Sequence, residues 1–292
     1  MRSSLAPDSV PLPGLDAVTV EKILVAFLRD ELRAAGLEQG VLGLSGGIDS
    51  AVVAALAARA LGPSNVTGVL MPAATSSADS LEDAQAVAAA TGIHTRVVPI
   101  AAMAAGYLDQ VPNASPLRRG NVYARCRMIV LYDLSAELGA LVLGTSNKAE
   151  LLLGYGTLHG DLASAINPIG DLYKTQVRLL AAHLDVPERV RTKAPSADLW
   201  VGQSDEADLG ASYEDLDRLL SRLVDERVAP DRLIEEGFES GFVRRIARQV
   251  RVNQYKRRPP VIAKLSTRTI GPDFRYPRDG ALARDRRLES AG

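Results

Sequence analysis

A glycine-rich segment with hydroxyl and carboxylate side chains occupies residues 43 to 50, Gly-Leu-Ser-Gly-Gly-Ile-Asp-Ser. Glycines let the backbone approach an anion closely, and successive N–H groups form a concave surface that binds phosphate. Ser45 and Ser50 can donate further hydrogen bonds, whereas the carboxylate of Asp49 would repel a phosphate unless a cation bridged the two groups. Mg²⁺ is a hard ion that binds carboxylate and phosphate oxygens. The segment therefore predicts a nucleotide-phosphate site with a magnesium ion at Asp49.

The elements around this segment place it at the end of a strand. A short apolar run, residues 40 to 45, precedes it, and an Ala-rich stretch, residues 50 to 61, follows, so the pattern predicts strand, tight turn and helix. The helix would direct its positive N-terminal end at the bound phosphate. A Walker A loop is excluded because no Lys-Ser/Thr pair follows the last glycine, and the Rossmann G-x-G-x-x-G spacing is also absent.

Short apolar runs and helical patterns alternate through the first half of the chain. Further strands are predicted at residues 66–71, 94–100 and 140–144, and helices at residues 18–35, 80–91 and 122–138. Continuous apolar runs are typical of strands that are buried on both faces of a parallel sheet. We therefore predict an α/β fold, a doubly wound parallel sheet with flanking helices, which binds ligands at the carboxyl ends of its strands.

The second half of the chain predicts a helical C-terminal part. A long glycine-rich loop, residues 147–172, leads to helices that are expected at residues 173–184, 213–226, 230–236 and 240–256. An irregular stretch is expected at residues 193–212. Residues 1–16 hold three prolines and predict a flexible lead-in outside the core. We expect a single domain over residues 17–260 and a C-terminal tail over residues 261–292.

The phosphate loop and five further segments resemble a known family. Ser-Gly-Gly-Ile-Asp-Ser resembles the pyrophosphate-binding loop of the N-type ATP pyrophosphatase superfamily, whose fold is adenine nucleotide alpha hydrolase-like. The other segments resemble the motifs of NAD synthetase in family order: GNVYARCRMI (120–129), GTSNKAELLLGY (144–155), INPIGDLYKTQVR (166–178), PSADLW (195–200) and QSDEADLG (203–210). The resemblance covers about residues 18 to 260.

The resemblance implies a ligase that forms a carbon–nitrogen bond. ATP would adenylate the nicotinate carboxylate of deamido-NAD with release of pyrophosphate, and ammonia would displace AMP to give NAD. Such a site needs mainly to align the reactants, neutralise phosphate charge and exclude water. A nucleophilic Ser-His or Cys-His pair is not required.

Motif matching also implies a role for individual residues. The ATP contacts would be Gly43, Leu44, Ser45, Gly46, Gly47, Ile48, Asp49, Ser50, Thr145, Lys174 and Ser196. Asp49 and Glu150 would be the Mg²⁺ carboxylates, and Lys174 would meet the departing pyrophosphate. Asp161 would hold the incoming ammonium or accept its proton.

The deamido-NAD contacts that the resemblance implies are Arg125, Asn121, Tyr132 and Tyr155. Positions 121, 125 and 132 share one face of the predicted helix. Asn121 and Tyr132 also fit a solvated helix face, and Tyr155 also fits a packed core position.

Three positions depart from the family pattern. Leu158 stands where many bacterial members have Lys, Ala165 where they have Asp, and Tyr255-Lys256 where they have a His-Lys pair. These positions bind deamido-NAD in the family, so the departures concern the pose of that substrate and not the ATP site. Arg257, Arg258 or a residue of a partner subunit are candidates to compensate.

Composition narrows the class of protein. The 34 Lys and Arg against 35 Asp and Glu argue against a protein that coats nucleic acid. The single cysteine, Cys126, cannot form an intrachain disulfide and is expected to pack, and three scattered histidines cannot supply a Cys/His metal cluster. No apolar run approaches the ~18 residues of a membrane helix. We expect a cytoplasmic protein with no nucleic-acid or membrane partner.

The nitrogen source, the assembly and the loops complete the expectations. Glutamine-dependent NAD synthetases carry a nitrilase-like domain ahead of the synthetase, and no such segment is present, so free ammonia is the expected donor unless a separate glutaminase delivers it. Synthetases of this family are homodimers, and the helices at 18–35 and 122–138 are candidate contacts. The loops at 73–80 and 193–212 are expected to close over the substrates.

Two other functions remain open from the sequence. The basic stretch 244–258 would suit an RNA-modifying member of the superfamily, such as a tRNA lysidine synthetase or a thiolase, although thiolation usually needs more cysteines than one. The chain could also be a non-catalytic module that senses ATP. The presence of both Asp49 and Glu150 argues against that, because binding alone would not need paired metal carboxylates.

Overall fold

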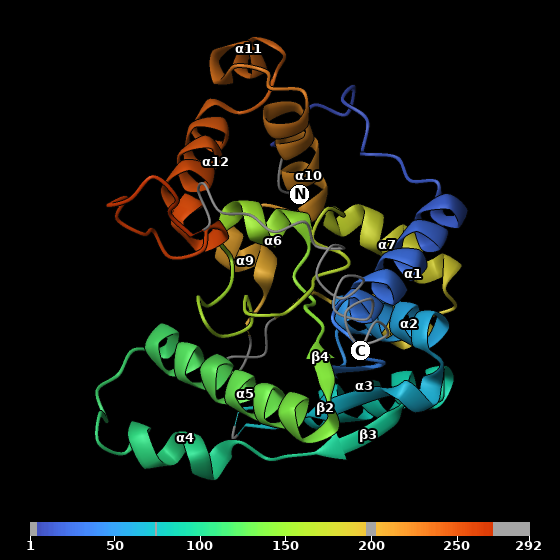
Figure 1. Ribbon diagram of the computed structural model, residues 1–292. Helices are drawn as coiled ribbons and strands as arrows, with labels where there is room; N and C mark the ends of the chain where they lie inside the picture. The colour runs from blue at the N-terminus through green and yellow to red at the C-terminus, as the bar shows by residue number, and fades with distance from the viewer. Residues whose placement is uncertain (1–4, 74, 197–202, 271–292) are drawn as a thin grey trace.

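A parallel sheet of four strands organises the chain (Figure 1). The computed structural model describes residues 5–73, 75–196 and 203–270. The strands are β1 (Gln39–Gly43), β2 (Val66–Leu70), β3 (His94–Val97) and β4 (Ala140–Val142). Their spatial order is β3-β2-β1-β4, with Gly40 of β1 paired to Val66 on one side and to Leu141 on the other. The predicted α/β fold with a parallel sheet is confirmed.

The order of the strands fixes where a ligand can bind. The chain runs outward from β1 through β2 to β3 and then returns to place β4 on the opposite side of β1. The chain therefore reverses its direction across the sheet between the neighbouring strands β1 and β4, and the loops that follow these two strands lie side by side. This switch point is the usual ligand site of open α/β sheets.

Helices cover both faces of the sheet. One face packs against α1 (Ala17–Ala34), α2 (Ile48–Leu61), α3 (Ala78–Thr91) and α7 (Lys174–His183), and the other against α4 (Ala101–Leu108) and α5 (Pro116–Leu138). Neighbouring strand residues alternate between the two cores, as Leu42 faces α2 while Val41 faces α5. The sequence did not predict α4, and α5 starts six residues earlier than expected because Ser115 caps it and Pro116 opens it.

The C-terminal part is helical and has a core of its own (Figure 1). Its elements are α9 (Asp205–Leu209), α10 (Tyr213–Leu220), a π-helical turn (Ser221–Asp225), α11 (Pro230–Glu235), α12 (Ser240–Val252) and the 3-10 helix η3 (Asn253–Arg257). The short helix α8 (Glu188–Thr192) instead packs on the first core through Val190. A second 3-10 turn, η1 (Pro63–Asn65), precedes β2. Within the described ranges, no helix combines the length and the apolar character needed to cross a membrane.

The segment ahead of α1 contributes to that second core. Ala6 is buried there, the N–H groups of Leu5 and Ala6 donate to the Asp215 carboxylate at 3.4 and 3.3 Å, and Arg218 donates to the Val10 carbonyl at 2.9 Å. The expectation that residues 1–16 lie outside the core is therefore wrong for this part of the segment. Its prolines and few apolar residues gave no local signal, because the groups that bind it come from α10, about two hundred positions away.

Candidate active site

A cavity of about 1000 Å³ opens at the carboxyl ends of β1 and β4. This volume lies at the upper end of the range for small-molecule sites. Its walls come from the loops after β1 and β4, from α5 and from the segment that follows α8. The sequence-predicted residues that line it are Gly43, Leu44, Ser45, Gly47, Ile48, Asp49, Ser50, Asn121, Thr145, Glu150, Tyr155, Asp161, Lys174 and Ser196.

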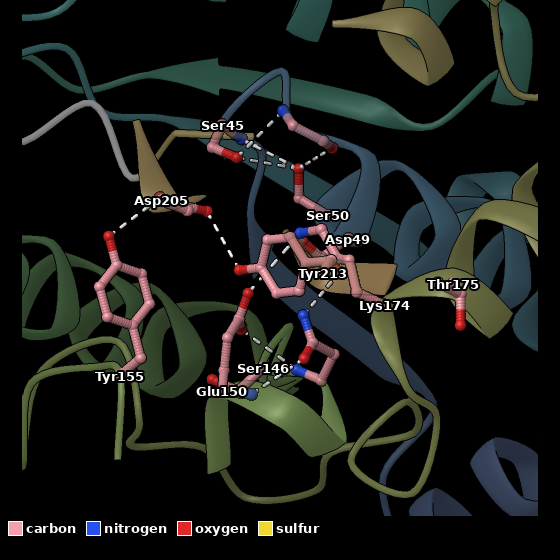
Figure 2. Close-up of polar contacts among 12 residues, drawn as sticks. Ser45, Asp49, Ser50, Ser146, Glu150, Tyr155, Lys174, Thr175, Asp205 and Tyr213 are labelled. Atoms are coloured by element: carbon pink, nitrogen blue, oxygen red, sulfur yellow. Dashed lines mark hydrogen bonds and ion pairs between the residues drawn. The ribbon is translucent and has the colours of Figure 1, made fainter. Parts of the chain in front are cut away.

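The loop between β1 and α2 is held by its own serines. The Ser50 hydroxyl donates to the Gly47 carbonyl at 3.0 Å, and the N–H groups of Ser45 and Gly47 donate to the Ser50 and Ser45 hydroxyls at 3.3 and 3.2 Å (Figure 2). No side chain caps the first turn of α2, so its N–H groups are available to an anion.

Gly46 has a structural reason to be glycine. It has a φ of +78°, and a Cβ at this position would lie 2.3 Å from the Ser80 carbonyl oxygen of α3. Gly46 is buried and is not among the described residues that line the cavity. Gly46 therefore shapes the loop against α3.

The two carboxylates predicted to hold metal meet in the cavity wall. Asp49 lies in the first turn of α2, and Glu150 lies on α6 (Lys148–Leu153), a short helix inside the stretch that the sequence predicted as loop. Lys174, the first residue of α7, binds Asp49 directly, and its Nζ lies 3.7 Å from Glu150 Oε1 (Figure 2). Three elements that are distant in sequence thus bring these groups together, as the family motifs implied.

Asn147 joins the two carboxylates. It is fully buried and forms a capping box at the start of α6, in which the Glu150 N–H donates to Asn147 Oδ1 at 3.0 Å and the Asn147 N–H donates to Glu150 Oε2 at 3.2 Å. Its Nδ2 donates to Asp49 Oδ1 at 3.2 Å. One side chain therefore fixes both carboxylates relative to each other.

Burial and charge act in opposite directions on this cluster. Burial would lower the pKa of Lys174, but the carboxylates of Asp49 and Glu150 hold it above its ordinary value, so the ammonium stays charged. Burial, with the nearby Asp49 charge, raises the pKa of Glu150 to about 8. Glu150 thus needs more positive charge beside it than Lys174 supplies to be fully ionised at neutral pH.

A magnesium ion fits these donors only together with a substrate. Within the described part of the chain, no group of three His, Cys, Asp or Glu side chains could hold a metal. Asp49 and Glu150 form a pair, and Mg²⁺ commonly binds one or two carboxylates while phosphate oxygens and water complete its octahedron. The site therefore suits magnesium that arrives with nucleotide phosphates.

Tyr155 follows α6 and lines the cavity. Its hydroxyl lies 3.0 Å from Asp205 Oδ1, and Tyr213 donates to Asp205 Oδ2 at 3.3 Å (Figure 2). The Tyr155 hydroxyl also lies 3.0 Å from Asp208 Oδ2. Burial first, and then the charges of the two aspartates, raise the pKa of Tyr155 above its ordinary value. The hydroxyl therefore stays protonated and anchored, with the ring beside the cavity.

A second part of the cavity wall is built around residues 154–161. Asp161 Oδ1 accepts the Thr157 N–H at 2.8 Å, and the Thr157 hydroxyl donates to Asn121 Oδ1 at 2.8 Å. Lys256 Nζ donates to the carbonyls of Gly154 and Gly156 at 2.7 and 2.8 Å. Burial lowers the pKa of Lys256, while the Asp161 carboxylate acts in the opposite direction. We call this region, with Tyr155, the α5 end, and we call residues 43–50 with Thr145, Glu150 and Lys174 the phosphate end.

Two predicted residues of α5 lie outside the cavity. Among the described residues that line it, α5 contributes Leu117, Asn121, Ala124, Arg127, Met128 and Leu131. Arg125 instead donates its Nε–H to the Leu158 carbonyl at 3.3 Å, and Tyr132 is 44% exposed. Positions 121, 125 and 132 do share one face of α5. The α5 residues that line the cavity, however, are centred on the neighbouring face that carries Ala124, so Arg125 and Tyr132 lie at the edge of the lining.

Comparison with known proteins decides the family. The family model for NAD synthase matches residues 20–260. The chain belongs to the NAD synthase family. It is 57% identical over 265 residues to an NH(3)-dependent NAD(+) synthetase of Chlorobaculum parvum, an alignment that covers 91% of this chain and 96% of that protein.

Solved NAD synthase structures share the fold. An NH3-dependent NAD synthetase from Campylobacter jejuni, in complex with the nitrate ion, aligns with a TM-score of 0.73 and 33% identity over 86% of this chain and 100% of that one. An NMN synthetase from Francisella tularensis aligns with a TM-score of 0.75 and 31% identity over 86% of this chain and 99% of that one.

The departures from the NAD synthase pattern fall around the α5 end. Leu158 and Ala165 are not among the described residues that line the cavity, and Tyr255 is 59% exposed, whereas Lys256 reaches the cavity. Arg257 donates to carbonyls of α6 instead of facing a substrate, so it cannot supply the compensation that the sequence suggested. Cys126 is buried in the core between α5 and the sheet, as its packing role requires.

Several residues of the site were missed in the sequence. Asn147 could have been found, because Asn-x-x-Glu before an apolar run is a capping-box signature. Lys193, which lines the cavity and donates to Asp83 Oδ2 at 2.7 Å, and Asp205 gave no local signal, because their partners come from other elements. The expected lid loops border the cavity through Ser76 and Lys193, while residues 74 and 197–202 lie outside the described part.

Proposed function

We propose that this chain is an ammonia-dependent NAD synthetase that converts deamido-NAD, ATP and ammonia to NAD, AMP and pyrophosphate. The observation that carries the proposal is the cluster of Asp49, Glu150 and Lys174 beside the phosphate loop, at the switch point of the sheet. The names of the relatives support ammonia as the nitrogen source and NAD as the product.

The first step is adenylation at the phosphate end. A carboxylate oxygen of the nicotinate group attacks the α-phosphorus of ATP, the bond to the bridging oxygen breaks, and pyrophosphate leaves. The first-turn N–H groups of α2 and the Ser45 hydroxyl bind the phosphates, and Lys174 adds positive charge for the pyrophosphate. Magnesium held by Asp49 and Glu150 would neutralise phosphate charge when bound.

The second step is amide formation. Ammonia attacks the carbonyl carbon of the adenylate, AMP leaves with the attacking oxygen, and one proton is lost from nitrogen. Asp161 lies in the cavity wall, where the surrounding protein shields its carboxyl from water and raises its pKa, while the hydrogen bond from the Thr157 N–H acts to lower the pKa. We assign Asp161 to hold ammonium and to take up this proton, with Tyr155 and Asn121 beside the nicotinate and its ribose.

The proposal extends to a homodimer in the cytoplasm. Exposed apolar side chains on α5 and α1 suit a contact between copies, among them Leu117, Ile129 and Tyr132 on α5 and Val18 and Ile23 on α1. Arg125 lies on the same exposed side of α5 as Ile129, one turn away, and could meet the substrate from such an interface.

An RNA-modifying function has less support in the structure. Part of the basic stretch 244–258 is committed to contacts within the chain: Arg245 donates to the Leu209 carbonyl at 2.7 Å, and Arg257 donates to carbonyls of α6. These cations therefore do not form a continuous surface for RNA phosphates. A tRNA arm nevertheless belongs in the test.

The test is a product assay with two acceptors and two nitrogen sources. Purified protein is incubated with ATP and Mg²⁺, with either deamido-NAD or nicotinic acid mononucleotide, and with either ammonium chloride or glutamine; NAD, NMN, AMP and pyrophosphate are measured by chromatography. We expect NAD from deamido-NAD with ammonium, and AMP and pyrophosphate in equal amounts. Product from nicotinic acid mononucleotide alone would show that the mononucleotide, and not deamido-NAD, is the substrate. Pyrophosphate release only with added tRNA would place the chain in the RNA-modifying branch of the superfamily.

A further inference from the structure

The helix that carries Glu150 is short and has an unusual C-terminal cap. α6 has six residues, and the last carbonyl groups of any helix have no partner within it. In this chain the N–H groups of Gly154 and Tyr155 donate to the Leu151 and Glu150 carbonyls at 3.3 and 2.9 Å, and further donors come from η3. Arg257 donates to the carbonyls of Leu151 and Leu152 at 3.0 and 2.6 Å, and Asn253 Nδ2 donates to the Leu153 carbonyl at 2.7 Å.

The cap continues past the helix into the cavity wall. Lys256 binds the carbonyls of Gly154 and Gly156, the residues on either side of Tyr155. Gly154 has a φ of +64°, and a Cβ there would lie 2.5 Å from Asn253 Cβ, so η3 can approach only because position 154 is glycine. Two cations at the C-terminal end of α6 also suit the negative end of its dipole.

Arg257 is fixed at its other side as well. Its second guanidinium nitrogen donates to the Val250 carbonyl and to Gln254 Oε1, both at 2.6 Å, so the planar fork joins α12 and η3 to α6. Such a fork cannot be reproduced by a lysine, whose ammonium is a single point. Arg257 is not among the described residues that line the cavity, so it acts through α6 and not on a substrate.

We propose that Arg257, with Asn253, is a positioning residue that sets the geometry of the C-terminal end of α6 and of residues 154–157 in the cavity wall from the C-terminal end of the fold. The kinetic part of this inference rests on the proposed function. Loss of the fork removes the donor of the Leu152 carbonyl, leaves the Leu151 carbonyl with the Gly154 N–H alone, and loosens the segment that carries Tyr155 and Thr157. ATP binding is left intact, because Asn147 fixes Glu150 in the first turn of α6 and the phosphate loop between β1 and α2 makes no hydrogen bond to Arg257 among those described.

The direct test is hydrogen–deuterium exchange followed by mass spectrometry on Arg257→Lys and Arg257→Met. Arg258→Met is the matched control, because it removes an equal charge from the exposed neighbouring residue. We expect exchange in residues 151–157 to rise about tenfold in both Arg257 variants and to stay at the wild-type rate in the control. Wild-type exchange in Arg257→Lys and Arg257→Met would overturn the proposal, and this readout is independent of activity.

The kinetic test separates positioning from general support of the fold. In Arg257→Lys we expect the KM for deamido-NAD to rise about tenfold and the Kd for ATP, measured by calorimetry, to stay within twofold of wild type. A Kd for ATP that rises in parallel with a falling Tm would show a merely structural role and overturn the proposal. If wild type made no NAD, the proposed function would fail while the exchange result still decided the role of Arg257.

Discussion

The two ends of the cavity are built in different ways. At the phosphate end, the N–H groups of the loop between β1 and α2, the hydroxyls of Ser45 and Ser50 and the buried ammonium of Lys174 lie together at the carboxyl ends of β1 and β4. At the α5 end, side chains from α5, the loop after α6 and η3 meet through a few hydrogen bonds, and three neighbouring positions depart from the family pattern. Phosphate chemistry demands fixed backbone geometry, whereas recognition of the second substrate can be rebuilt from different side chains. Substitutions should therefore cost most at the phosphate end.

The largest effect is expected for Asp49→Asn. The variant keeps the size of the side chain but removes the charge that binds Lys174 and that would hold magnesium. Because a catalytic cation is worth several kcal/mol, we expect kcat to fall about 10³-fold. Pyrophosphate release measures the loss, circular dichroism checks the fold, and Asp30→Asn, whose side chain is 71% exposed, is the control. Full activity in Asp49→Asn would remove Asp49 from the mechanism.

Asn147→Ser should weaken magnesium binding selectively. Serine can still cap α6, but its hydroxyl is too short to reach Asp49 Oδ1, so the two carboxylates lose their link. We expect the Mg²⁺ concentration at half-maximal rate to rise about tenfold, the usual effect of losing a partner of a metal ligand. Binding of Mn²⁺ in the presence of ATP, measured by electron paramagnetic resonance, should weaken in the same proportion.

Asn65→Ser is the matched control for that variant. Asn65 donates to the Leu61 carbonyl at 2.9 Å and is not among the described residues that line the cavity, so its loss removes a comparable hydrogen bond elsewhere. An equal change in Mg²⁺ dependence in both variants would contradict the role given to Asn147.

Asn121→Ala probes the α5 end. The variant removes the acceptor of the Thr157 hydroxyl and one polar group of the cavity wall. Because one hydrogen bond contributes about 1 kcal/mol, we expect the KM for deamido-NAD to rise about fivefold and the KM for ATP to stay at its wild-type value. Steady-state kinetics with each substrate varied in turn provide the measurement. Equal changes in both KM values would show that the two ends are not separate.

The smallest effect is expected for Leu158→Lys, which restores the residue of many bacterial members. Leu158 does not line the cavity within the described residues, and its carbonyl already accepts the Arg125 Nε–H. We therefore expect the KM for deamido-NAD to change less than about twofold, within the range of ordinary surface substitutions. Leu158→Met serves as the uncharged control. A KM that falls tenfold with lysine alone would show that the α5 end of this chain has lost a substrate contact.

The sequence predicted the phosphate end better than the α5 end for a physical reason. Residues 43–50 carry their own turn, hydroxyls and helix start, and the four strands follow from short apolar runs. Local patterns could not reveal that Arg257 binds α6 and that Lys256 binds the residues after it, because about a hundred residues separate the partners. The same holds for Ala6 against α10. For α4 and α6, short helices without a clear amphipathic period, the pattern was too weak to predict them.

The most direct test of the account follows one oxygen atom. Deamido-NAD labelled with ¹⁸O in both oxygens of the nicotinate carboxylate is converted to NAD with ATP, Mg²⁺ and ammonium, and the products are analysed by mass spectrometry. Adenylation at the phosphate end predicts one ¹⁸O in the AMP phosphate, one in the amide of NAD and none in pyrophosphate. NAD formed with unlabelled AMP would contradict the adenylate and, with it, the role assigned to the phosphate end.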